Sequence, residues 1–157
     1  MRATDWQMPA IPRGATRLIT APAPVSFIMP ADRKLIAVID DDVFILKALE
    51  RNVRAAGYRC QTFTCAEDFL RMVRELFVAC VISDINLGGM SGLQLAVHPV
   101  MLELAIPIVL ITGSIEPHIE EPARTVAAAL LHKPIPPGKL LDAIVDTVGP
   151  PIADGDF

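Results

Sequence analysis

Apolar residues follow two different patterns along the chain after residue 33. In some segments they form short continuous runs, typical of buried strands, and in others they recur every three or four positions, typical of amphipathic helices. The runs predict strands at residues 34–40, 58–63, 79–84, 107–112 and 129–133. The periodic segments predict helices at residues 43–56, 66–75, 92–102, 119–128 and 139–148. We expect the third helix to be interrupted near Pro99, because proline lacks the backbone N–H that a helix interior needs.

Strands and helices alternate regularly in this prediction. The connections between strands are too long for hairpins, so the strands are expected to be parallel and joined by right-handed crossovers through the helices. Runs such as LFVACVIS at residues 76–83 are apolar up to their last residue. Strands that helices cover on both faces need such runs. The predicted fold class is α/β, with a parallel sheet between helices.

The chain of 157 residues is expected to contain a single folded domain, at residues 34–149. Residues 1–33 contain scattered prolines without a hydrophobic period, which predicts a disordered, proline-rich arm. A docking peptide anchored by Trp6 is the alternative. Residues 150–157 are expected to form a short tail, with no further domain after the last helix.

Composition indicates which kinds of binding partner and which cellular compartment to expect. There are 14 basic and 18 acidic residues, giving a net charge of −4, and no basic block, so direct DNA binding is not expected. No apolar run approaches the roughly 20 residues of a membrane span. No signal-peptide pattern is visible, and the three cysteines form no Cys-x-x-Cys pair, as is usual in a reducing compartment. A cytoplasmic protein without membrane attachment is therefore expected.

Polar residues fall where four of the five predicted strands end. These residues are Asp40, Asp41 and Asp42 after the first strand, Asp84 in the third, Thr112 in the fourth and Lys133 in the fifth. An aspartate after a strand is often only a helix cap. However, the carboxyl ends of parallel strands meet at one edge of the sheet, where α/β proteins bind their ligands. The sequence therefore predicts one site that contains most of these side chains.

The residue types indicate phosphoryl chemistry with a metal ion. Clustered carboxylates suit Mg²⁺, which prefers oxygen ligands, and a hydroxyl and an ammonium suit phosphoryl oxygens. We expect Asp84 to accept the phosphoryl group, because it ends the central strand and precedes a glycine-rich loop. Asp40 and Asp41 are then expected to hold the metal, and Asp42 to cap the following helix.

Four motifs resemble those of the receiver domain of two-component response regulators. They are VIDDD at 38–42, VISDINLGGMSG at 81–92, VLITG at 109–113 and HKP at 132–134. The resemblance implies a flavodoxin-like, doubly wound sheet of five parallel strands in the order 2-1-3-4-5. It also implies that Asp84 is the phosphoacceptor, that Thr112 is the switch hydroxyl and that Lys133 pairs with the phosphate.

The same resemblance implies a Mg²⁺ site. Asp40 and Asp41 match the family's acidic pair, with Asp41 as the direct ligand, Asp84 also contacts the metal, and Asn86 supplies its backbone carbonyl. The implied function is that of a stand-alone, non-enzymatic signalling protein. It would receive its phosphoryl group from a sensor histidine kinase or a histidine phosphotransfer protein and would pass the signal to a downstream protein. The oligomeric state stays open.

The chain departs from the family pattern in the region that reports phosphorylation. Leu130 stands where an aromatic residue is usual, and Gly88 stands where a proline is common. The connection between the fourth and fifth strands contains Pro117 and Pro122. We therefore expect phosphorylation to act chiefly on the connection at residues 113–128.

Two other functions are compatible with parts of the sequence. The segment IDDD also matches the Asp-x-Asp motif of haloacid-dehalogenase-type phosphatases, with Asp40 as nucleophile and Asp42 as acid and base. Those enzymes need Gly and Thr soon afterwards, where this chain has Val43 and Phe44, and they have no use for Asp84. The third possibility is a receiver-like interaction module that works without phosphorylation.

Overall fold

The computed structural model describes residues 33–152. The predicted proline-rich arm, residues 1–33, lies outside these residues except for its last position. The predicted tail, residues 150–157, lies outside them from residue 153 onward.

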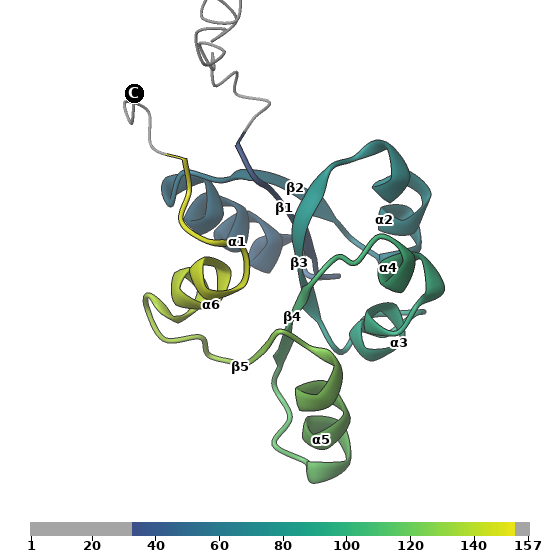
Figure 1. The fold of residues 1–157 in the computed structure, drawn as a ribbon. Coiled ribbons are helices and arrows are strands. Elements are labelled where there is room, and N and C mark those ends of the chain that lie inside the picture. Colours follow the sequence, from purple (N-terminus) through teal and green to yellow (C-terminus); the bar gives the residue numbers. More distant parts are fainter. Residues whose placement is uncertain (1–32, 153–157) are drawn as a thin grey trace, which may run out of the picture.

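A five-stranded sheet forms the centre of the molecule (Figure 1). Its strands are β1 (Leu35–Ile39), β2 (Arg59–Phe63), β3 (Val78–Asp84), β4 (Ile108–Thr112) and β5 (Ala129–His132). They are all parallel and lie in the order β2-β1-β3-β4-β5. This confirms the predicted doubly wound, flavodoxin-like sheet. The strand order reverses between β1 and β3, and the carboxyl ends of these two parallel strands lie side by side.

Helices cover both faces of the sheet. They are α1 (Val43–Ala55), α2 (Ala66–Met72), the 3-10 turn η3 (Val73–Glu75), α3 (Gly92–Ala96), α4 (Pro99–Glu103), α5 (Pro117–Val126) and α6 (Lys139–Val148). Figure 1 shows α1 and α6 together on one side and α2, α3 and α4 on the other. Each predicted helix is therefore present, although the second and the third each consist of two segments.

Two hydrophobic cores form because successive strand residues point to opposite faces. In β1, Ile36 and Val38 pack into the core beneath α1 and α6, whereas Ala37 and Ile39 pack into the core beneath the other helices. All five residues of β1 are buried. This two-sided burial explains why the strands read as continuous apolar runs.

Prolines determine where two of the helices begin. The interruption predicted near Pro99 is present: α3 ends at Ala96, and α4 starts at Pro99. The helix predicted to begin at Ile119 begins two residues earlier, at Pro117. Proline is well tolerated at the first position of a helix, because the N–H it lacks would have no partner there.

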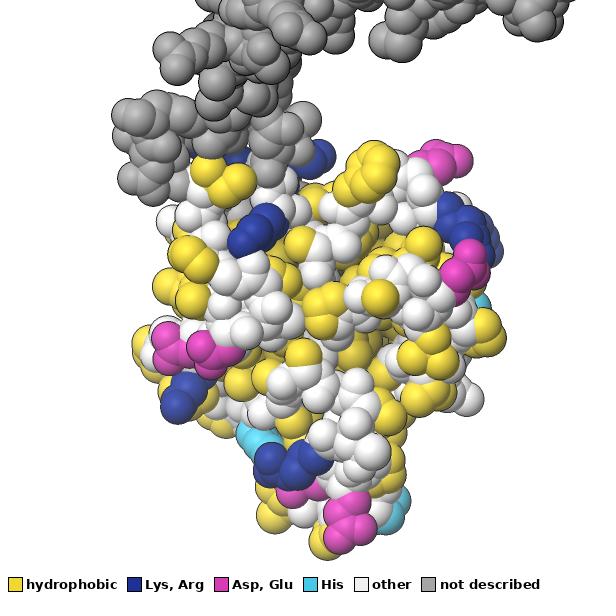
Figure 2. Space-filling view, in the orientation of Figure 1, with side chains coloured by type: hydrophobic (Ala, Val, Ile, Leu, Met, Phe, Trp, Pro, Cys, Tyr) yellow, Lys and Arg dark blue, Asp and Glu magenta, His cyan; other side chains and the backbone are white. Residues whose placement is uncertain are grey.

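The surface of the described residues carries scattered charge. On the face seen in Figure 2, basic and acidic side chains are interspersed among hydrophobic ones and do not gather into a field of one sign. None of the helices in residues 33–152 has the length and apolar character needed to cross a membrane.

Candidate functional site

The polar residues predicted to converge lie at the carboxyl edge of the sheet. Asp40 directly follows β1, and Asp84 is the last residue of the neighbouring strand β3. Asp84 is in register with Ile111, so Thr112 lies one position further along the adjacent strand β4. Lys133 follows β5, the next strand in the sheet. The strand order thus brings together residues that are far apart in the sequence.

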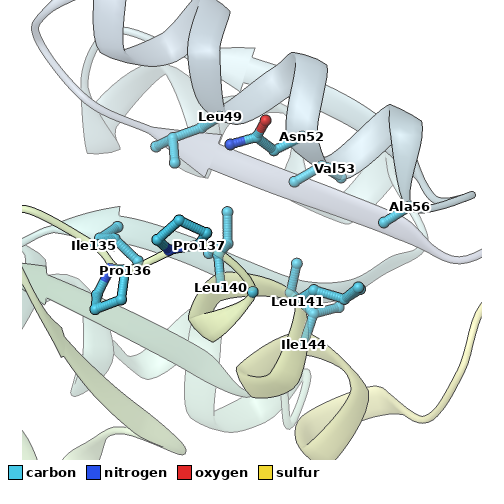
Figure 3. A pocket seen from close by; sticks show the side chains of 11 residues that line it. Leu49, Asn52, Val53, Ala56, Ile135, Pro136, Pro137, Leu140, Leu141 and Ile144 are labelled. Carbon is cyan, nitrogen blue, oxygen red and sulfur yellow. The ribbon is translucent and has the colours of Figure 1, made fainter.

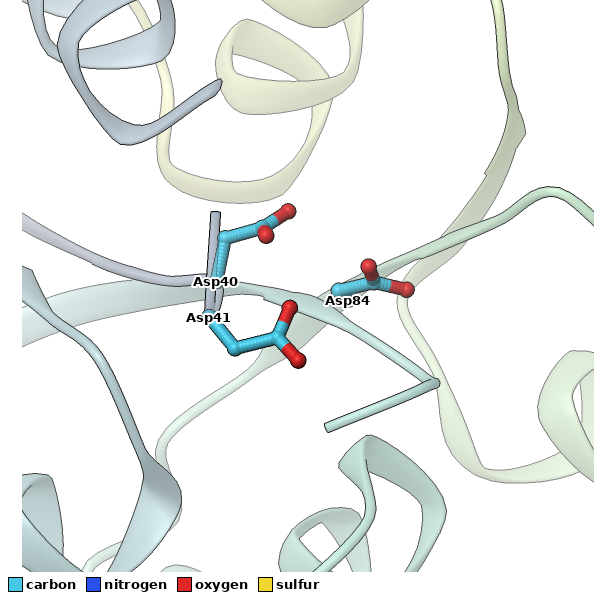
Figure 4. A group of neighbouring side chains, drawn as sticks. All are labelled: Asp40, Asp41 and Asp84. Atoms are coloured by element: carbon cyan, nitrogen blue, oxygen red, sulfur yellow. The ribbon is translucent and has the colours of Figure 1, made fainter. Parts of the chain in front are cut away.

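Three carboxylates gather at the point where the strand order reverses. Oxygen atoms of Asp40, Asp41 and Asp84 all lie within 4.8 Å of one another. Figure 4 shows Asp40 and Asp41 extending from the end of β1 toward the side chain of Asp84. Asp40 and Asp84 are buried, whereas Asp41 is exposed. The cluster therefore has two fixed carboxylates and one at the solvent boundary.

Lys133 connects two of these carboxylates. Its Nζ donates a hydrogen bond to Oδ2 of Asp84 at 2.7 Å and lies 3.6 Å from Oδ2 of Asp40. Burial alone would lower the pKa of Lys133, but the hydrogen bond and charge of Asp84, together with Asp40, outweigh it and raise that pKa. The ammonium therefore stays protonated at neutral pH and offsets part of the negative charge of the site.

The surroundings of Asp40 disfavour its charged form. Burial raises its pKa, the backbone N–H of Asp42 and the charge of Lys133 lower it, and Asp84 and Asp41 raise it again, so that the net shift is upward. Oδ1 accepts the N–H of Asp42 at 2.8 Å. Oδ2 is buried and has no hydrogen-bond partner among the described residues.

The donor set fits a small divalent cation. The carboxylate oxygens of three aspartates lie close together, and one of these oxygens is buried without a hydrogen bond. An oxygen in that state costs free energy unless a cation or another donor satisfies it. Mg²⁺ typically binds one or two carboxylates and keeps several waters. The exposed position of Asp41 is compatible with such partly hydrated binding.

Asp42 plays a different part from its two neighbours. Its Oδ1 accepts the backbone N–H groups of Phe44 at 2.9 Å and Ile45 at 3.3 Å, which makes it the N-cap of α1. This confirms the predicted capping role. The side chain is thereby directed to the helix end and not to the carboxylate cluster.

Asn86, in the loop after β3, and Thr112, the last residue of β4, lie at the same edge of the sheet. The backbone N–H of Asn86 donates to Oδ1 of Asp84 at 3.0 Å, so both oxygens of Asp84 have partners. Thr112 is fully buried, and its Oγ1 accepts the N–H of Ser114 at 3.0 Å. A carbonyl role for Asn86 and a switching role for Thr112 remain predictions.

Two acidic residues that the sequence did not single out make long-range contacts near the site. Oε1 of Glu67, in α2, accepts the N–H of Met90 in the loop after Asp84 at 2.8 Å. Glu120, in α5, contacts the ring of His132, which directly precedes Lys133. Both glutamates lie on predicted helices, but nothing in their spacing indicates a partner in another element.

A separate apolar pocket of about 360 Å³ lies between α1 and α6 (Figure 3). Leu49 and Val53 of α1 face Ile144 of α6 across it, and the loop after β5 closes one side with Pro136 and Pro137. The residues that line it include none of the predicted site residues, so phosphoryl chemistry would not take place there. It is an apolar concavity separate from the carboxylate cluster.

The comparison with known families agrees with this geometry. The family model described as the response regulator receiver domain matches residues 36–145. The chain belongs to this family. The match includes the IDDD segment at residues 39–42, which therefore lies within a receiver domain.

Curated relatives of this receiver domain include transcriptional regulators. The phosphoglycerate transport system transcriptional regulatory protein PgtA of Salmonella typhimurium is 35% identical over 74% of this chain and 28% of its own length. The response regulator protein TmoT of Ectopseudomonas mendocina is 36% identical over 54% of this chain and 39% of its own length. The chain thus spans less than half the length of these two relatives.

Solved structures show the same fold. The response regulator StyR is 32% identical to this receiver domain, with a TM-score of 0.66 over 74% of this chain and 59% of StyR. The chemotaxis protein CheY4 of Vibrio cholerae is 23% identical, with a TM-score of 0.67 over 73% of this chain and 98% of its own chain. At that identity the second likeness concerns the fold alone.

Proposed function

We propose that this receiver domain accepts a phosphoryl group on Asp84 from a sensor histidine kinase or a histidine phosphotransfer protein. The observation that carries the proposal is the 2.7 Å hydrogen bond from Lys133 to Asp84, within a site that contains two more carboxylates. A lysine held at this distance supplies a positive charge where phosphoryl oxygens would arrive. A purely structural ion pair would not require a further buried carboxylate beside it, that of Asp40, whose Oδ2 has no hydrogen bond.

The proposed reaction is the transfer of a phosphoryl group from a phosphohistidine. A carboxylate oxygen of Asp84 attacks phosphorus, the P–N bond of the donor breaks, and the electron pair of that bond leaves with the imidazole. The product is an acyl phosphate on Asp84. Lys133 pairs with one phosphoryl oxygen, and the hydroxyl of Thr112 donates a hydrogen bond to another.

Mg²⁺ would be held by Asp40, Asp41, Asp84 and the backbone carbonyl of Asn86. When bound, the ion would neutralise charge on the phosphoryl oxygens and on the carboxylates around them. Asp40 and Asp84 are fixed by burial and by backbone hydrogen bonds from Asp42 and Asn86. These contacts hold the two side chains in place before the ion or the donor arrives.

The phosphodonor protein would bind on the side of the site formed by α1 and the loop after β5. Phe44, two residues beyond the N-cap of α1, is 78% exposed. The pocket between α1 and α6 offers a second apolar surface (Figure 3). Exposed aromatic side chains are common in protein–protein interfaces. The downstream protein would then recognise the phosphorylated form by direct contact.

The test is labelling with acetyl phosphate and Mg²⁺, followed by mapping of the phosphate. We expect one base-labile phosphate on Asp84, and its loss in Asp84→Asn while the circular dichroism spectrum stays unchanged. Asp40→Asn is the matched control: it should reduce the rate of labelling but leave the phosphate on Asp84. A phosphate mapped to Asp40 would favour the phosphatase-like chemistry. Absence of labelling by acetyl phosphate and by phosphohistidine donors would favour the phosphorylation-independent module.

A further inference from the structure

Backbone hydrogen bonds fix the base of the loop between Asp84 and α3. At the base, the carbonyl of Ile85 accepts N–H groups from Leu87 at 3.2 Å and from Gly92 at 3.0 Å. Gly92 packs so closely that a Cβ there would lie 2.5 Å from the carbonyl oxygen of Asp84. The start of α3 is fixed separately by a capping box between Ser91 and Gln94.

The tip of the loop contains two consecutive glycines. Gly89 has a φ of +88°, a conformation that side-chain-bearing residues rarely adopt. A Cβ added to Gly88 would meet no atom within 4 Å, so nothing packs against that position. Glycine backbone has the largest conformational freedom of any residue. The tip therefore needs a contact from another element if it is to hold one conformation.

Glu67 provides that contact. Its Oε1 accepts the backbone N–H of Met90 at 2.8 Å, and a Cβ on Gly89 would lie only 2.8 Å from the same oxygen. The carboxylate thus lies directly against the backbone of the tip. The Met90 N–H also lowers the pKa of Glu67, so the side chain is ionised at neutral pH and accepts a charge-assisted hydrogen bond.

We propose that Glu67 is a positioning residue, which acts through the loop at residues 85–91 to hold Asp84 and Asn86 in the arrangement that binds the cation. The proposal rests on the proposed function for the identity of the site. Asn86 lies two residues after Asp84 and bonds to it through its backbone N–H. Asn86 thus connects the carboxylate of Asp84 to the loop, and Met90, which Glu67 holds, lies four residues further along it. A loop that is already ordered loses less entropy when the ion binds.

The experiment compares three variants of the full chain. Glu67→Ala removes the acceptor, and Glu67→Gln keeps an oxygen acceptor of the same reach without the charge. Asp68→Ala is the matched control, because Asp68 is the next residue of α2 and its carboxylate pairs with Arg71 at 2.7 Å and not with the loop. The measurements are amide hydrogen exchange at Met90 by NMR, Mg²⁺ affinity by calorimetry, and the melting temperature.

For Glu67→Ala we expect exchange at Met90 to rise by about tenfold, because one charge-assisted hydrogen bond is lost. We also expect the Kd for Mg²⁺ to rise by about three- to tenfold, because ordering the loop then accompanies binding. Glu67→Gln should lie closer to the wild type than Glu67→Ala in both measurements. Asp68→Ala should match the wild type in Mg²⁺ affinity and in Met90 exchange.

Three results would overturn the proposal. They are unchanged Met90 exchange in Glu67→Ala, faster exchange with unchanged Mg²⁺ affinity, and an equal loss of affinity in Asp68→Ala. A fall in melting temperature without a change in affinity would assign Glu67 to the stability of α2 alone.

Labelling of Asp84 is followed in parallel. A wild type that binds Mg²⁺ but takes no phosphate would overturn the proposed function without deciding on Glu67, which the exchange and affinity measurements test separately.

Discussion

The ammonium of Lys133 lies 2.7 Å from Oδ2 of Asp84, although the two residues are 49 positions apart in the sequence. The contact spans β4, since Asp84 ends β3 and Lys133 follows β5. The same ammonium lies 3.6 Å from Asp40, which follows β1. One ammonium group thus links the ends of three strands. Its removal would leave two buried carboxylates without the positive charge of Lys133.

Lys133→Met should make the stability of the metal-free protein depend more strongly on pH. Lys133 lowers the pKa of Asp40, which is already raised by burial, so the variant should raise it further. A carboxyl group with a raised pKa in the folded state contributes stability at low pH, and that contribution is lost as the pH rises through the folded pKa. We expect a loss of about 1–2 kcal/mol at pH 7 that shrinks as the pH is lowered.

Urea unfolding at several pH values in the presence of a chelator measures this effect. Lys139→Met is the control, because Lys139 is exposed at the start of α6. A pH dependence that is the same in Lys133→Met and in the control would contradict the expected coupling between Lys133 and Asp40.

Asp41→Ala should weaken Mg²⁺ binding but leave the stability of the metal-free protein unchanged or higher. Asp41 is exposed, and its oxygens lie close to those of two other carboxylates, so its removal relieves repulsion. Calorimetric titration with Mg²⁺ and thermal unfolding with a chelator provide the two measurements. A clear loss of stability in the metal-free variant would mean that Asp41 has a structural role.

Asp42→Ala should show the opposite pattern. Its carboxylate caps α1 through Phe44 and Ile45, and the loss of such a cap costs about 1 kcal/mol. We expect a lower melting temperature and a Mg²⁺ affinity close to that of the wild type. An affinity reduced as much as in Asp41→Ala would contradict the separation of roles between these adjacent residues.

Cys65 should react first with thiol reagents in the native protein. Burial raises the pKa of Cys60 and of Cys80 to about 12, and only the thiolate is strongly nucleophilic. Cys65 is only partly buried. Mass spectrometry after iodoacetamide treatment at pH 8 should find modification at Cys65, with the other two sites appearing only in denaturant. Equal labelling of all three sites in the native protein would show that the core beneath α1 and α6, which contains Cys60 and Cys80, opens readily.

Phosphorylation should change hydrogen exchange most between residues 113 and 128. Thr112 holds the N–H of Ser114 at 3.0 Å, and Oγ of Ser114 holds the N–H of Glu116 at 3.2 Å, directly before α5. A movement of the Thr112 hydroxyl therefore reaches the start of that helix through two hydrogen bonds. Since α5 is already formed, we expect higher protection of an existing helix. A change centred on Leu130 in β5 would indicate the family's usual switch.

Much of the local structure is encoded by neighbouring residues. The continuous apolar runs predicted the strands, because residues buried on both faces must all be apolar. Asp42 was recognisable as a cap, since the cap and the N–H groups it accepts lie within three residues of one another. Pro99 likewise marked the break between α3 and α4. Such features depend on interactions within a single turn of the chain.

The candidate site was predictable for a related reason. Parallel strands carry their carboxyl ends to one edge of the sheet, so residues that end strands must meet there whatever their separation in sequence. The grouping of Asp40, Asp84 and Lys133 follows from the alternation of strands and helices, together with the motifs at these positions. Their distances and burial depend on the order of the strands.

Only the tertiary structure decided which helix residues support the site. Glu67 and Met90 are 23 positions apart, and their contact exists because α2 packs beside the loop that follows β3. Glu120 meets His132 because α5 lies against β5. A solvent-facing glutamate and a partner-bearing one look alike in a helical pattern. Their difference arises from the packing of elements distant in sequence, which local periodicity does not record.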